Sequence, residues 1–162
     1  MKTSDLAAVL ENLRVQKPLI LSLTNSVVQP ITANMLLAAG ASPVMLNDAG
    51  ESAQLLRICA NGLLINVGTL SRPQAEQMRA AVDAAQSAGV PWVLDPVAVG
   101  LLGFRTEFCR ELLGFSPALI RGNASEIMAL AGETAGGRGT DTTEDSSAAV
   151  QAARQLDRQC SC

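Results

Sequence analysis

Hydrophobic positions along the chain alternate between short unbroken apolar runs and longer segments in which apolar residues recur every three or four positions. The unbroken runs predict β-strands at 19–24, 42–46, 62–68, 91–99 and 117–122. The periodic segments predict α-helices at 29–39, 50–60, 72–88, 104–114, 124–132 and 144–158. Pro73 falls in a first helical turn, and Gly40 and Gly89 fall just beyond helix ends, which supports these boundaries.

The strands are apolar on both faces and are separated by helices. This order predicts a mostly parallel sheet covered by helices on both sides, that is, a three-layer α/β/α sandwich. A length of 162 residues is enough for one such domain with a single core.

Polar or otherwise unusual residues follow each predicted strand. In parallel α/β sheets, ligands bind beyond the carboxyl ends of the strands, so these residues are expected to meet at one rim. Together they place an amide, a hydroxyl, two carboxylates and a guanidinium there. They are Thr24 and Asn25 after the first strand, Met45 at the end of the second, Gly68 and Thr69 after the third, Asp95 in the fourth, and Arg121, Asn123 and Glu126 after the fifth.

The charged members of this set also have purely local interpretations. Asn123 and Glu126 have the spacing of a helix-capping box, although a cap can also serve a site. Asp95 before a proline is typical of a turn. Arg121 can be an exposed ion-pair partner, so both interpretations stay open for each residue.

The less polar members are weaker signals on their own. Met45, within an apolar run, is more typical of a core residue than of a ligand contact. Gly68 and Thr69 can simply end a strand and cap the helix that follows.

The joint chemistry of the rim is more specific. Asp95 and Glu126 can hold Mg²⁺ directly or through water, and Arg121 can neutralise phosphate oxygens. This combination favours phosphoryl transfer from a magnesium-nucleotide. A P-loop is excluded, because the only lysines are Lys2 and Lys17 and "GGRGTD" (136–141) lacks the Walker pattern; we interpret that stretch as a flexible connector.

Composition excludes several other classes. A net charge of −3 without a basic run argues against a nucleic-acid partner. Histidine is absent, which excludes hydrolysis by a Ser-His or Cys-His pair within this chain. The four cysteines are scattered and are expected to be reduced, and no apolar run reaches membrane-spanning length. We therefore expect a soluble cytoplasmic protein.

Four motifs carry a resemblance to a known family. The stretches "LTNSVVQPITANMLLAAGASPVM", "LLINVGTL", "PWVLDPVAVG" and "IRGNASEIMALAG" resemble the hydroxyethylthiazole kinases of thiamine salvage and biosynthesis, members of the ribokinase-like superfamily. The likeness runs from about residue 10 to residue 145. It implies transfer of the ATP γ-phosphate to the hydroxyl of 4-methyl-5-(2-hydroxyethyl)thiazole, with Mg²⁺, in a homotrimer whose sites lie between subunits.

The resemblance also implies individual roles. By motif, Arg121 and Asn123 would meet the ATP phosphates, and Asp95 and Glu126 would organise Mg²⁺. The thiazole pocket would be lined by Asn25, Val27, Met45, Gly68 and Thr69. On this interpretation the Arg-Gly-Asn run lies at a strand end because phosphate and metal meet there, and Asn123 caps the helix at the same time.

The sequence departs from the family pattern at its end. Family members continue into another strand, a nucleotide-binding segment and a Gly-Thr-Gly-Cys turn whose backbone N–H groups stabilise the transferring phosphoryl group. No such turn occurs here, and Cys160 and Cys162 lack the glycines to replace it, so no catalytic residue is predicted. We expect the first three fifths or so of a ribokinase-like kinase domain, incomplete at its C-terminus, with little activity alone. A frameshift near residue 157 and a fragment of an intact enzyme both stay open as explanations.

Two other functions are compatible with the pattern. One is a non-catalytic module that binds a small ligand or completes an oligomer. The other is a related kinase acting on a pyrimidine or sugar alcohol, although "LTNSVVQPITAN" and "NVGTL" resemble the thiazole kinases rather than those relatives. Thiazole binding without ATP consumption would indicate the first, and turnover of a different alcohol the second.

Overall fold

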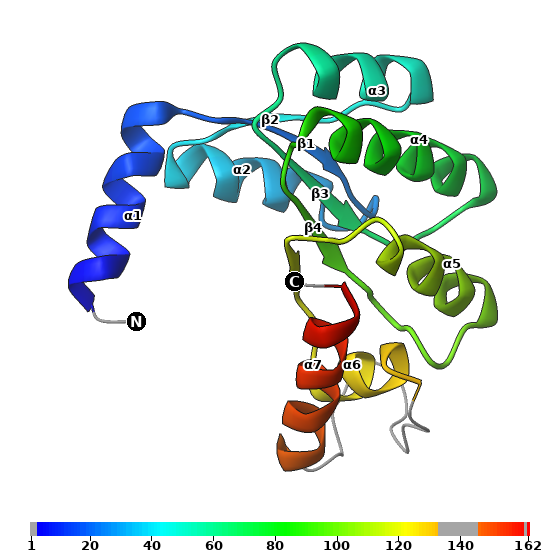
Figure 1. Cartoon of the computed structure of the whole chain (residues 1–162). Helices are drawn as coiled ribbons and strands as arrows, with labels where there is room; N and C mark the ends of the chain where they lie inside the picture. The colour runs from blue at the N-terminus through cyan, green and yellow to red at the C-terminus, as the bar shows by residue number, and fades with distance from the viewer. Residues whose placement is uncertain (1–2, 133–145, 161) are drawn as a thin grey trace.

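A parallel five-stranded sheet forms the centre of the protein (Figure 1). The computed structural model describes residues 3–132, 146–160 and 162. The strand order is β2-β1-β3-β4-β5, and every neighbouring pair is parallel. All five predicted strands are present, each with a shorter span: β1 Leu19–Leu23, β2 Ser42–Val44, β3 Gly62–Asn66, β4 Trp92–Asp95 and β5 Leu119–Ile120.

The six predicted helices are present within a residue or two of their expected ends. Their bounds are α2 Gln29–Ala39, α3 Ala49–Ile58, α4 Arg72–Ala88, α5 Gly103–Leu113, α6 Ala124–Leu130 and α7 Ser146–Cys160. The connector at 136–141 lies outside the described residues. A further helix, α1 (Thr3–Gln16), was not predicted. Its apolar residues Leu6, Val9, Leu10 and Leu13 recur at helical spacing, but among its described side chains only Leu13 is even partly buried.

Local capping chemistry explains why the longest helix starts and stops where it does. The Ser71 side chain accepts from the Gln74 backbone N–H, and the Gln74 side chain accepts from the Ser71 N–H, a complete capping box. Pro73 occupies the first turn, where no intrahelical N–H is needed. Gly89 ends α4 with φ +68°, a left-handed conformation that glycine adopts without strain. These positions confirm the sequence-based boundaries.

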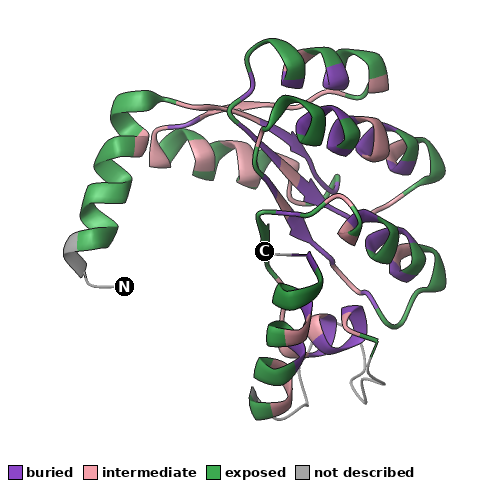
Figure 2. Cartoon of the chain, viewed as in Figure 1, coloured by how far each residue is buried: buried purple, intermediate pink, exposed green. Residues whose placement is uncertain are grey.

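Helices lie on both sides of the sheet, as predicted. Figure 1 shows α3, α4 and α5 along one face and α2 on the other, beside β1 and β2. The burial colours of Figure 2 concentrate on the strands and on the sides of α4 and α5 that face them. The α/β class with a parallel sheet is therefore confirmed.

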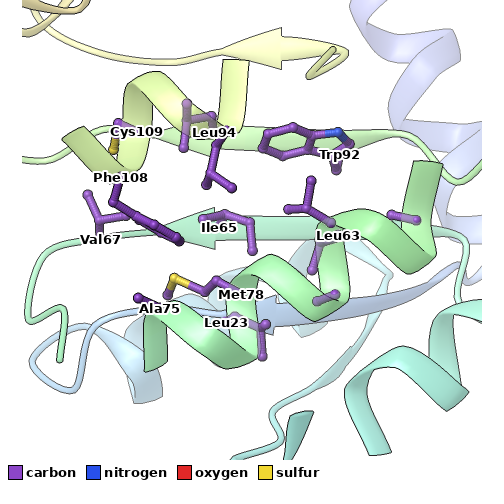
Figure 3. Packing of buried hydrophobic residues seen from close by; sticks show 14 of the residues in the cluster. Leu23, Leu63, Ile65, Val67, Ala75, Met78, Trp92, Leu94, Phe108 and Cys109 are labelled. Atoms are coloured by element: carbon purple, nitrogen blue, oxygen red, sulfur yellow. The ribbon is translucent and has the colours of Figure 1, made fainter. Parts of the chain in front are cut away.

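The core lies between the sheet and the face formed by α3, α4 and α5. Leu21, Ile65 and Leu94, on three adjacent strands, are fully buried. Figure 3 shows Ile65 and Leu94 beside Met78 of α4 and Phe108 of α5. Each such side chain removed from water contributes about 1.5–3 kcal/mol, so this layer holds the strand ends of the site at fixed positions.

The opposite face is only partly covered by α2. Next to α2 lies an apolar hollow of about 370 Å³, lined by Leu13, Ile20, Leu36, Leu64 and Val93 among others. Leu64 and Val93 project from β3 and β4 and are half-buried. The strands are thus apolar on both faces, as the sequence indicated.

The last helix packs on α6. Ala152 and Leu156 of α7 are buried, as their spacing predicted, and Ala148 is half-buried. The Gln155 side chain donates to the carbonyl of Ala131 at 3.1 Å and fixes the position of α7 at the end of α6. No helix among the described residues has both the length and the apolar character needed to cross a bilayer.

Candidate functional site

The carboxyl ends of β1, β3 and β4 meet at one rim of the sheet. Asn66 at the end of β3 pairs in register with Asp95 at the end of β4. Asn25 follows β1 on the other side of β3 and reaches Asn66 through a side-chain hydrogen bond. The predicted site residues therefore converge because parallel strands all end at the same edge.

The turn from β1 to α2 is folded around the side chain of Asn25. Asn25 is buried, with 8% of its surface exposed. Its Oδ1 accepts from the backbone N–H groups of Val27 and Val28, each at 3.1 Å. Its Nδ2 donates to Asn66 Oδ1 at 2.7 Å. The Val27 side chain, by contrast, is 75% exposed and is available for contact with a ligand or another subunit.

The loop after β3 is joined to this turn. The Gly68 N–H donates to Asn66 Oδ1 at 3.0 Å, and the Ser26 N–H donates to Thr69 Oγ1 at 3.1 Å. A Cβ atom at residue 68 would lie 2.7 Å from Asn25 Nδ2, so the close approach of the two loops requires glycine. Asn25, Gly68 and Thr69 thus form one cluster, which we call the turn cluster.

Met45 follows β2 directly and is partly buried. Its thioether is not tied to the turn cluster by hydrogen bonds. Its predicted role therefore rests on the resemblance alone.

Asp95 is a buried carboxylate whose two oxygens have different surroundings. Oδ2 accepts from Asn66 Nδ2 at 2.7 Å and from an Arg121 guanidinium nitrogen at 3.3 Å. Oδ1 is buried and has no hydrogen-bond partner among the residues that the structure describes. Burial raises the pKa of Asp95 above its usual value. The hydrogen bond from Asn66 and the charge of Arg121 lower this pKa in part, and the charge of the nearby Glu126 raises it further. A cation at Oδ1 would relieve both the burial of charge and the repulsion from Glu126.

Arg121 lies directly beyond β5. Its backbone N–H donates to the carbonyl of Leu94 at 2.9 Å, which extends the pairing with β4 by one residue. Its side chain is 74% exposed and forms an ion pair with Asp95. Most of its guanidinium N–H donors consequently face solvent, where an anion can reach them.

Glu126 and Asn123 form a capping box, so the local interpretation of this pair is confirmed. Asn123 Oδ1 accepts from the Glu126 N–H and Glu126 Oε2 accepts from the Asn123 N–H, both at 2.9 Å. Glu126 Oε1 accepts from the Ala98 N–H at 3.1 Å. Ala98 has φ +61°, an unfavourable conformation for alanine, and this bond helps to hold it. Glu126 therefore fixes the loop after β4 to the start of α6, whatever else it binds.

The donor set fits Mg²⁺ in combination with a nucleotide. No group of three or more acidic, cysteine or histidine side chains suited to a metal occurs in the part of the chain that the structure describes. Asp95 and Glu126 are close enough to affect each other electrostatically, and the unpartnered Asp95 Oδ1 is the oxygen best placed to accept a cation. Magnesium in kinases is typically held by one or two carboxylates, with phosphates and water completing the shell.

Asn66 is the residue that sequence reasoning missed. It lies within the "LLINVGTL" motif, is buried at 7% exposure, and contacts both the turn cluster and Asp95. The available signal was that this polar residue ends an apolar central strand. The strands on either side were already expected to end in site residues.

Comparisons with known proteins agree with these motifs. The profile of the Hydroxyethylthiazole kinase family matches residues 10–162. A hydroxyethylthiazole kinase from Pectobacterium atrosepticum is 63% identical over 153 residues, covering 94% of this chain and 58% of the relative. One from Escherichia coli (strain 55989 / EAEC) is 54% identical over 159 residues, covering 98% of this chain and 60% of the relative.

A solved structure of the hydroxyethylthiazole kinase protein from Pyrococcus horikoshii OT3 superposes with a TM-score of 0.84 at 35% identity. The match covers 97% of this chain and 58% of that chain. The chain thus spans about three fifths of the length of these relatives.

Proposed function

The chain belongs to the hydroxyethylthiazole kinase family, and from that premise we propose that it provides the thiazole, metal and phosphate contacts of an ATP-dependent kinase. The reaction transfers the γ-phosphate of ATP to the hydroxyl of 4-methyl-5-(2-hydroxyethyl)thiazole. Asp95 carries the proposal, because one oxygen is held by neighbouring side chains while the other is buried without a partner. Such an arrangement is costly unless a ligand completes it.

Phosphoryl transfer depends mainly on positioning and on neutralising charge. In this proposal Arg121 is anchored by Asp95 at one nitrogen and directs its remaining donors to the ATP phosphates. Asn123 lies two residues further along the same loop and would contribute to the phosphate side. Asp95 and Glu126 would hold Mg²⁺, which when bound would supply positive charge near the transferring group.

The thiazole side of the site is formed by the turn cluster with Val27 and Met45. The side-chain Oδ1 of Asn25 accepts from the Val27 N–H and fixes the backbone that presents Val27. Glycine at residue 68 lets the loop after β3 pack directly against Asn25, because any side chain there would displace Asn25. The acceptor alcohol would therefore lie between this cluster and Asp95.

Oligomerisation is part of the proposal. Val27, which precedes α2, and Ile31 and Met35 within it follow one another at four-residue spacing, and all three are at least 64% exposed. Such a stripe beside the proposed thiazole site supports a homotrimer with sites between subunits, as in the family resemblance. We also place the protein in the cytoplasm, consistent with four free thiols.

Ligand binding by the Arg121→Ala variant tests the assignment. Loss of a charged donor to phosphate costs about 1.5–3 kcal/mol, so affinity for Mg²⁺ with a non-hydrolysable ATP analogue should fall roughly 10- to 100-fold by calorimetry. Affinity for hydroxyethylthiazole should change less than about twofold. Arg57→Ala, an exposed arginine on α3, is the matched control and should leave both affinities unchanged.

Equal losses for both ligands would contradict the role given to Arg121. Turnover is measured in parallel as thiazole-dependent ADP release, with the E. coli relative as positive control. Thiazole binding by this chain without ADP release would indicate a binding role in place of catalysis.

A further inference from the structure

Asn66 lies between the two halves of the proposed site. It ends β3, the strand between β1 and β4, and its side chain is buried. On one side its Oδ1 accepts from Asn25 Nδ2 at 2.7 Å and from the Gly68 N–H at 3.0 Å. On the other side its Nδ2 donates to Asp95 Oδ2 at 2.7 Å. A single amide thus contacts both thiazole-side loops and the metal-side carboxylate.

The orientation of the hydrogen bonds along this path is fixed. Val27 and Val28 donate to Asn25, Asn25 donates to Asn66, and Asn66 donates to Asp95. Rotating either amide by half a turn would bring two donors together, and for Asn66 it would also set a carbonyl against a carboxylate. All the bonds therefore point from the turn after β1 towards Asp95.

A chain of hydrogen bonds aligned in one direction is cooperative, because each acceptor that is polarised becomes a better donor at its other end. A carboxylate at the end of the chain strengthens every bond before it. A cation on the free Oδ1 of Asp95 withdraws electron density from Oδ2 and weakens the bond from Asn66. The change then reaches Asn25 and the backbone N–H groups of Val27 and Val28.

We propose that Asn66 is a positioning residue that couples the metal-phosphate half of the site to the thiazole half. It orients Asp95 so that Oδ1 stays available, and through Asn25 it sets the backbone that presents Val27 to the thiazole. Occupation of one half therefore changes the geometry offered to the other. The inference rests on the proposed function for the identity of the two ligands, whereas the coupling itself belongs to the protein.

The coupling is measured first without any ligand, by ¹H–¹⁵N spectra of the full chain. Asp95→Asn removes the terminal charge, and we expect it to shift the amide signals of Val27 and Val28. In the Asn66→Ala background the same substitution should shift them at least fivefold less. Asn61→Ala is the matched control, since Asn61 lies at the opposite end of β3, is exposed, and accepts only the Leu19 N–H among its described contacts.

Equal shifts in both backgrounds, or no shift in either, would overturn the coupling. Should Asn66→Ala fail to fold, Asn66→Leu replaces it. That variant keeps a side chain of similar size with neither donor nor acceptor, and it should likewise suppress the response at Val27 and Val28.

Titration with Mg²⁺ alone separates this inference from the proposed function. In the unsubstituted chain and in Asn61→Ala, Mg²⁺ should shift the signals of Gly122 and Ala98 together with those of Val27. In Asn66→Ala the first two should still respond and Val27 should not. Absence of any Mg²⁺ response would refute the metal assignment, and the ligand-free comparison would still decide the coupling.

Discussion

Replacing Gly68 with alanine inserts a methyl group where the structure has no room for one. The new Cβ would lie 2.7 Å from Asn25 Nδ2 and 2.8 Å from both Asn25 Cβ and Cγ. Real Cβ atoms do not approach other heavy atoms so closely, so Asn25 must move. The backbone at residue 68 has no positive φ, and the effect is therefore steric.

The expected size follows from what Asn25 loses. Its side chain makes three hydrogen bonds, to Asn66, Val27 and Val28. At about 1 kcal/mol for each, with part of the loss recovered by relaxation, Gly68→Ala should destabilise the chain by about 2–3 kcal/mol. With an m-value of about 2 kcal/mol/M, the urea midpoint falls by roughly 1–1.5 M.

Urea unfolding followed by circular dichroism measures this change, and calorimetry measures thiazole affinity under native conditions. Gly103→Ala is the matched control, because a Cβ there meets nothing within 4 Å, and its midpoint should change by less than about 0.5 M. If Gly68→Ala unfolds at the same urea concentration as the parent chain, Asn25 is not packed against residue 68 and the turn cluster is incorrect as described.

Three further changes have equally direct expectations. Leu156→Ala should lower the free energy of unfolding by about 2–5 kcal/mol in thermal or urea unfolding, because the side chain is only 2% exposed. Val150→Ala, on the exposed face of α7, should lower it by less than about 0.5 kcal/mol. Similar losses for the two variants would mean that α7 is not docked. Glu111→Gln should lower the free energy of unfolding by less than about 1 kcal/mol at neutral pH, because the ion pair of Glu111 is exposed. The hydrogen bond from its arginine partner lowers the pKa of Glu111. A lowered pKa stabilises the fold above the usual glutamate value, so the difference from the parent should vanish as the pH falls towards 3, and a difference that grew on acidification would contradict this. Burial raises the pKa of the Cys109 thiol to about 12, so iodoacetamide labelling read by mass spectrometry should modify the exposed Cys59 long before Cys109.

Apolar periodicity was sufficient to predict the fold, because the elements that build it bury a face. The strands and the helices α2 to α7 all place apolar residues where the pattern requires them, and Leu156 is an example at the far end of the chain. The helix α1 was missed although Leu6, Val9, Leu10 and Leu13 recur at helical spacing; in the structure this stripe is mostly exposed and adds little to the core. Strand ends were predicted too long, because a polar residue such as Asp95 ends the pairing before the apolar run stops.

The position of several candidate residues at one rim was predictable, but the network that joins them was not. Topology alone brought Asn25, Asp95 and Arg121 to one rim. It did not reveal that Asn66 bridges them, because an asparagine at a strand end has many local uses and its partners lie far apart in sequence. The two uses of Glu126, as a cap and as the acceptor for the Ala98 N–H, likewise depend on a tertiary contact that no spacing encodes.

The order of strands in the sheet has a consequence for how the chain is made. After β2 has paired with β1, β3 pairs with the other side of β1, and β4 and β5 are then each added beside the strand that precedes them in the chain. The additions of β4 and β5 each close only a short loop through one helix, so their entropic cost stays small. The sheet can therefore extend strand by strand during synthesis, with Asn25, Asn66 and Asp95 brought together as soon as β4 emerges from the ribosome.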